Sequence, residues 1–140
     1  MRILIIILLL AASLSAKAYT EAELVAAVLV GEAGIDGRAG LCCVREVVAT
    51  RSARRGLTEA QVVVQRLQFS CLNGVRRADL VAKSRKHPLW AYALWLAENP
   101  VATNFTKGAT HFDSVHFRKP SWAAGLTPVA VVLHHRFYIV

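Results

Sequence analysis

An unbroken apolar run at residues 3–10 constrains this chain more than any other feature of its sequence. Arg2 precedes the run, and the small-x-small sequence Ala-Lys-Ala follows it at 16–18. A positive start, a short apolar stretch and a small-residue cleavage site are typical of a secretory signal peptide. The run is shorter than the about 20 apolar residues of a membrane-spanning helix, although an uncleaved anchor is the alternative. We therefore expect residues 1–18 to be a signal peptide and the protein to be exported, to the periplasm or the cell exterior.

The remaining chain has the size and composition of one globular domain. Removing residues 1–18 from the 140 leaves residues 19–140, and removing Arg2 and Lys17 lowers the formal charge from +8 to +6. With 19% charged residues and abundant apolar ones, the chain is not of the disordered class. The basic excess favours an anionic partner or surface. A nucleic acid is not expected, because the aromatic residues are not interleaved with the charges and export argues against it.

Helix signals dominate the first two thirds of the mature chain. Capping boxes begin at Thr20 and at Thr58, each with a carboxylate or amide side chain three residues later. In the second helix Leu41, Val44 and Val48 form an apolar stripe, and its arginines are expected to face elsewhere. The expected helices span residues 20–30, 38–55, 58–65, 79–86 and 89–98.

Strand signals appear only in the last third of the chain. Residues 110–113 and 129–140 are rich in Val, Thr and aromatic side chains, so each is expected to be a strand. Helices followed by strands predict an α+β fold, mainly helical, with a small antiparallel sheet at the C-terminal end.

Glu32 is the first residue that could carry chemistry. It follows an apolar helix and lies between Gly31 and Gly34. The negative end of a helix dipole and apolar surroundings both favour a protonated carboxyl group, which suits a general acid. The two glycines would let a substrate approach the backbone. The alternative is an ordinary solvated Glu at a helix end.

A second group of candidates lies in the strand region. Residues 108–113 and 120–123 combine polar side chains with flat aromatic rings, as sugar sites do. The alternative is an ordinary strand and turn, with Trp122 filling the core. A metal site among the nearby histidines is weakly supported, because His134 and His135 would point to opposite faces of a strand. We expect neither a metal nor a cofactor.

The three cysteines allow two interpretations. Export permits a disulfide between Cys71 and either Cys42 or Cys43, which would leave one thiol over. The alternative is three buried thiols that act as small apolar residues. A catalytic thiol is not favoured, because Cys42 and Cys43 lie in mid-helix, away from the positive end of the dipole.

Several motifs along the mature chain resemble one known family. Their order and spacing resemble the cell-wall hydrolases of the spore-cortex-lytic type, whose catalytic domains are small and lysozyme-like. The Gly-Glu-Ala step that includes Glu32 resembles the family's opening motif, which holds its catalytic glutamate. The other matching stretches are residues 44–51, 68–70, 108–112, 120–123 and 135–138.

This resemblance implies cleavage of the glycan strand of peptidoglycan, with Glu32 as the catalytic acid and base. A lytic transglycosylase needs only one carboxylate, because the 6-hydroxyl of the same muramic residue is the nucleophile. A hydrolase usually needs a second acid, for which Asp36 and Asp113 are the candidates.

The resemblance also suggests which side chains bind the polymer. Polar groups would position hydroxyl and acetamido groups, and aromatic rings would stack on the sugars. The protein is then a monomer that associates peripherally with the cell envelope and binds peptidoglycan. A non-catalytic wall-binding module is the main alternative, and a thiol- or metal-dependent hydrolase is another. The expected polymer-binding residues are Gln68, Ser70 and His111 for positioning, with Phe112 and Trp122 for stacking.

Overall fold

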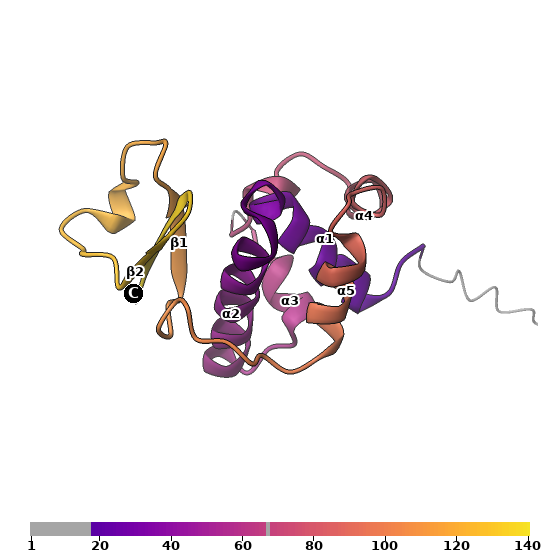
Figure 1. Cartoon of the computed structure of the whole chain (residues 1–140), viewed down its shortest axis with the longest axis horizontal. Helices are drawn as coiled ribbons and strands as arrows, with labels where there is room; N and C mark the ends of the chain where they lie inside the picture. Colours follow the sequence, from indigo (N-terminus) through magenta and orange to yellow (C-terminus); the bar gives the residue numbers. More distant parts are fainter. Residues whose placement is uncertain (1–17, 67) are drawn as a thin grey trace, which may run out of the picture.

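The computed structural model of the protein describes residues 18–66 and 68–140. The expected signal peptide therefore lies, except for Ala18, outside the described residues. Figure 1 shows a group of helices on one side and a small sheet on the other, with α2 between them. The fold is α+β, as the order of the sequence patterns predicts. No helix within the described ranges is long and apolar enough to cross a bilayer.

The first helix begins where its capping box predicts. In α1 (Glu21–Ala33) the Thr20 hydroxyl accepts from the Glu23 N–H at 3.1 Å, and the Glu23 carboxylate accepts from the Thr20 N–H at 2.8 Å. The helix continues to Ala33, because Ala33 is buried and the pattern of apolar residues does not stop at Gly31. The expected end near Gly31 is wrong, so Glu32 lies in the last helical turn.

The second helix follows after a single tight turn. The 3-10 turn η1 (Gly34–Asp36) leads directly into α2 (Gly37–Arg55), which ends at Gly56 in the left-handed conformation, φ 63°. Gly56 is therefore the stop that the sequence predicts.

Helix α1 is the centre of the helical part. Residues 24–29 are all buried, because other helices surround α1. A helix that is apolar all round is the type that a core encloses. Its neighbours are α2, α3 (Glu59–Val63), α4 (Arg77–Ser84) and α5 (Trp90–Glu98).

The sheet has three antiparallel strands in the order β1-β3-β2. They are β1 (His111–Ser114), β2 (Ala130–Val132) and β3 (His135–Tyr138). The single strand expected at 129–140 is wrong, because Leu133 adopts φ 50° and a two-residue turn folds the segment into a hairpin. A core of Cys43, Val47, Ala109 and Phe137 joins the sheet to α2.

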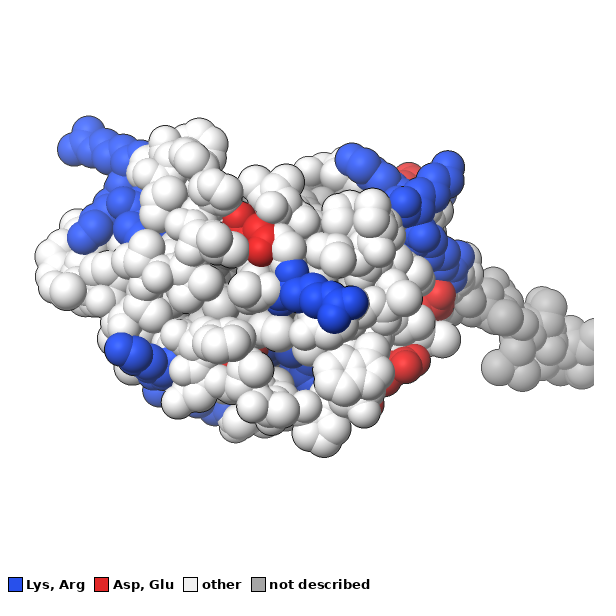
Figure 2. All heavy atoms as spheres, viewed as in Figure 1, with Lys and Arg blue, Asp and Glu red and all other residues white. Residues whose placement is uncertain are grey.

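Part of the positive charge gathers around α4, and other bases are spread over the rest of the surface. In Figure 2, Lys and Arg side chains gather over α4, at the upper right. The exposed bases of this segment include Lys83 and Lys86, and Arg85 pairs with Glu23 of α1 at 2.7 Å. Two arginines of α2, Arg45 and Arg51, are buried instead of facing away from the core.

Candidate functional site

A cleft of about 770 Å³ lies between the end of α1 and the sheet. Helical residues form one wall, and residues of β1, of the loop after β1 and of the β2–β3 hairpin form the other. Every site residue expected from the sequence lines this cleft, although the six are spread over 91 positions of the chain. They are Glu32, Gln68, Ser70, His111, Phe112 and Trp122.

Glu32 is held by the segment that follows α3. The Cys71 N–H donates to Oε1 of Glu32 at 2.9 Å, and the Ser70 hydroxyl lies 3.3 Å from Oε1 and 3.4 Å from Oε2. A hydrogen bond from a backbone N–H fixes a carboxylate more firmly than a mobile side chain does, because the backbone has less freedom to move. Oε2 keeps only the weak contact with Ser70, so it is the oxygen left for a reacting group.

Gly31 explains how the Cys71 N–H comes so close to Glu32. A Cβ atom built on Gly31 would lie 2.7 Å from Cβ of Cys71 and 2.9 Å from its Sγ. Any side chain at this position would push the Cys71 segment away. The glycine before Glu32 therefore has a structural purpose, which is to allow the backbone hydrogen bond to the carboxylate.

The cysteines are free thiols, so the disulfide interpretation is wrong. Burial and the nearby Glu32 raise the pKa of Cys71, and burial followed by the charge of Glu46 raises the pKa of Cys43 to about 12. Both groups stay protonated at neutral pH, and a protonated thiol is a poor nucleophile.

The sheet wall carries an imidazole and an indole side by side. The rings of His111 and Trp122 lie 5.2 Å apart, and Trp122 is 40% exposed. Burial, followed by the charges of Arg51 and Arg55, lowers the pKa of His111. His111 is therefore neutral at pH 7, and a neutral imidazole can donate or accept a hydrogen bond.

Phe112 is less available than the sequence suggests. Its ring lies 6.2 Å from Phe69, 5.9 Å from Phe137 and 5.4 Å from His135, so most of it packs inside the protein. It forms part of the cleft wall, and Trp122 presents the larger free aromatic surface.

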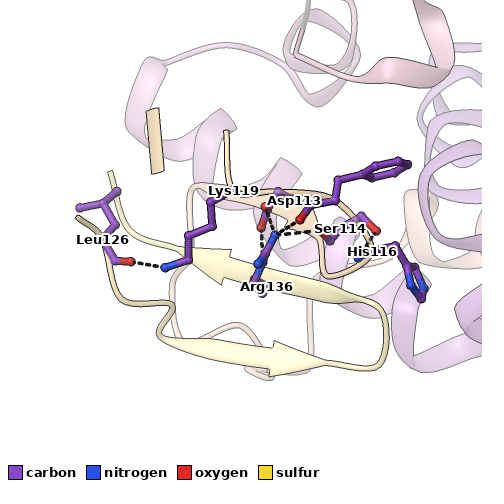
Figure 3. A network of polar contacts seen from close by, with 7 residues as sticks. Asp113, Ser114, His116, Lys119, Leu126 and Arg136 are labelled. Atoms are coloured by element: carbon purple, nitrogen blue, oxygen red, sulfur yellow. Dashed lines mark hydrogen bonds and ion pairs between the residues drawn. The ribbon is translucent and has the colours of Figure 1, made fainter. Parts of the chain in front are cut away.

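Phe117 is an aromatic residue of the cleft that sequence reasoning missed. Its side chain is 75% exposed and lines the cleft. Arg136 holds the preceding turn, because its Nη2 donates to the Ser114 and Phe117 carbonyls, both at 2.9 Å (Figure 3). The same guanidinium binds Asp113 through two contacts of 2.9 and 2.5 Å. Asp113 is therefore engaged in an ion pair and is not a free second acid.

Asp36 connects the two walls of the cleft. Its carboxylate is fully buried, and its two oxygens bind Nδ1 of His134 and Nδ1 of His135, the latter at 2.7 Å. The expectation that these histidines point to opposite faces is wrong, because His134 belongs to the hairpin turn. Asp36 lies only four residues beyond Glu32, so it fixes the sheet wall next to the catalytic candidate. It is also not a free second acid.

Arg51 is a charged residue of the cleft wall, a position that the sequence did not indicate for it. Its Nε donates to the Thr110 carbonyl at 2.5 Å, and its guanidinium lies 5.1 Å from the centre of the Phe69 ring. Only 3% of the residue is exposed. Burial lowers the pKa of Arg51 to about 10, which still leaves it charged at neutral pH.

Glu32 lies where two cavities meet. A second cavity of about 590 Å³ extends towards α4 and shares Gly31, Glu32 and Ile35 with the cleft. Its walls are mainly apolar and include Leu80 and Lys83. A groove that extends to both sides of one carboxylate has room for an extended ligand.

The described residues contain no group of three His, Cys, Asp or Glu side chains placed to hold a metal ion. His116 and His134 stack with ring centres 4.9 Å apart, and His134 is committed to Asp36. Comparison with protein-family models, curated proteins and solved structures finds no match to this chain. The inference of function therefore depends on the cleft itself and on the motifs that line it.

Proposed function

We propose that this protein cleaves the glycan strands of peptidoglycan, with Glu32 as the proton donor. The observation that carries the proposal is the fixed carboxylate of Glu32 in a groove lined by aromatic and polar side chains. Protein sites for sugars combine these two kinds of group, because pyranose rings have apolar faces and polar edges. A helical domain with one acidic residue at the edge of a cleft is, in this proposal, a lysozyme-like domain.

In the proposed reaction Glu32 protonates the glycosidic oxygen as the bond to the sugar breaks through an oxocarbenium-like state. The resulting carboxylate then accepts the proton of the 6-hydroxyl on the same muramic residue, which closes a 1,6-anhydro ring. This is the route of a lytic transglycosylase. It is supported by the state of Asp36 and Asp113, which are both engaged in internal contacts where a hydrolase would need a free second acid.

The other cleft residues would bind the polymer. Trp122 offers an aromatic face, while Gln68, Ser70 and His111 offer hydrogen-bonding groups to hydroxyl and acetamido oxygens. The exposed bases of α4 would hold the exported protein near the anionic cell wall, an attraction that salt weakens. In this proposal the protein acts as a monomer without a cofactor, peripherally associated with the envelope.

The experiment compares wild type, Glu32→Gln and Glu98→Gln on purified peptidoglycan sacculi. Glu98 is an exposed acid outside the cleft, so its amide variant is a matched control. Soluble fragments are expected from wild type and Glu98→Gln, with none from Glu32→Gln. In mass spectra, anhydro-muramic ends identify a transglycosylase and reducing ends a hydrolase.

Two results would contradict the proposal. Full activity of Glu32→Gln would remove the residue from the mechanism. Sedimentation of the wild type with sacculi without any product would favour the alternative, a wall-binding module without catalysis.

A further inference from the structure

The guanidinium of Arg51 is a buried cation whose hydrogen bonds are largely unused. Its Nε binds the Thr110 carbonyl, while Nη1 is enclosed and has no partner among the residues that the structure describes. Glu32 is close enough for its charge to influence the pKa of Arg51, yet the structure shows no ion pair between these two described residues. Arg51 differs in this from Arg45, which is also buried but binds Glu59 at 2.6 Å.

A buried and unpaired charge is unusual, because nearly all buried polar groups have partners. Leaving a cation without a counter-charge costs several kcal/mol in a typical protein interior. Arg51 could be relieved of this cost by a ligand, since it lines the same cleft as Glu32 and His111. Within the described residues no carboxylate forms an ion pair with Arg51, because Glu32 acts on it only at a distance and Asp113 binds Arg136.

We propose that Arg51 is a binding site for a carboxylate of the substrate. A guanidinium pairs well with a carboxylate, because the hydrogen bond is charge-assisted and the charges cancel. In Arg51 the nitrogen left for such a ligand is Nη2, because Nε binds the Thr110 carbonyl and Nη1 is enclosed. In a glycan of N-acetyl sugars, the carboxylate nearest the scissile bond is the lactyl group of muramic acid. That group is charged only where the stem peptide has been removed, so the site selects strands without peptides.

The identity of the sugar rests on the proposed function, but the carboxylate site does not. Two monosaccharides distinguish binding through the carboxylate from binding through the sugar ring. N-acetylmuramic acid and N-acetylglucosamine differ only in the lactyl ether, which carries the carboxylate. Lactate alone tests the carboxylate without a sugar. Neither sugar is cleaved, so binding can be measured by NMR titration without interference from catalysis.

The wild type is expected to bind N-acetylmuramic acid about tenfold more tightly than N-acetylglucosamine, the range for a hydrogen bond between charged groups. Arg51→Met should abolish this preference. Arg55→Met is the matched control, because it removes a positive charge from the same helix at an exposed position outside the cleft. That control should keep the preference.

A second measurement needs no variant. The charge of Arg51 contributes to the lowered pKa of His111. A bound carboxylate cancels that charge, so saturation with N-acetylmuramic acid should raise the pKa of His111, and saturation with N-acetylglucosamine should raise it less. The signal of the His111 ring reports this change directly.

Equal affinity for the two sugars in the wild type would overturn the proposal, and so would a preference that survives in Arg51→Met. Binding of lactate that depends on Arg51, with no binding of either sugar, would support the carboxylate site and count against peptidoglycan as substrate. Activity of Glu32→Gln together with an Arg51-dependent preference would leave this site in place and reject only the catalytic assignment.

Discussion

The two walls of the cleft are built by different physical means. The helical wall rests on α1, which is buried among four other helices, and Glu32 is held by one backbone N–H. The sheet wall has a small core and is held instead by charged contacts, those of Asp36 with two histidines and of Asp113 with Arg136. Apolar packing is spread over many residues, whereas a charged contact depends on one or two. The sheet wall should therefore be the easier one to disrupt.

The largest effect is expected from Asp36→Ala. This change removes a buried carboxylate and leaves two imidazoles without their partner, which should lower the free energy of unfolding by about 3 kcal/mol. Urea unfolding measures the loss, and hydrogen exchange should locate it in β2 and β3. Asp79→Ala is the control, because Asp79 pairs with Arg76 on the exposed surface. Equal losses in the two variants would show that Asp36 does not connect the walls.

A smaller effect on stability, but a large one on activity, is expected from Gly31→Ala. The new methyl group overlaps with Cys71, so the variant should lose about 1–3 kcal/mol and the contact to Glu32. Release of fragments from sacculi measures activity. Combining Gly31→Ala with Cys71→Gly removes the overlap and should restore part of the activity. No recovery in the double variant would mean that Gly31 acts in another way.

The smallest effect is expected in the pH dependence of the free energy of unfolding. The folded-state pKa of His111 lies below the value in the unfolded chain, because of burial and of Arg51 and Arg55. As the pH falls through the usual range for histidine, about 6.5, the unfolded chain takes up the proton first, so stability is lost. The contribution is fully present above this range. His111→Gln should therefore show a weaker loss of stability between pH 7.5 and pH 5 than wild type, which urea unfolding at each pH measures.

The sequence predicted the helical wall better than the sheet wall for a physical reason. The start of a helix is determined by contacts between residues that are close in the sequence. The capping boxes at Thr20 and Thr58 each involve only four consecutive residues, so the sequence alone indicates them. Glu32 was found because glycine and a carboxylate stand together at a helix end. The sheet wall depends on partners far apart, since Asp36 and His135 are 99 positions from each other. No local pattern indicates such a pair.

Arg51 is a case in which a local signal was present and was misinterpreted. The apolar stripe at Leu41, Val44 and Val48 continues with helical spacing to position 51, so this side chain had to face inwards. A charge at such a position was expected to turn away, yet the structure buries it. Phe117 was missed because an exposed aromatic in a loop has no periodicity from which its direction could be inferred.

The order of the strands decides when this cleft can exist. Of the three strands, β3 comes last along the chain but lies in the middle of the sheet, where it pairs with both β1 and β2. Until residues 135–138 have been synthesised and have paired, β1 and β2 lack the strand that joins them, and the wall opposite Glu32 is incomplete. A chain in which these residues are missing or still unpaired has Glu32 in place but an incomplete groove, so under the proposed function cleavage would have to wait until β3 has paired.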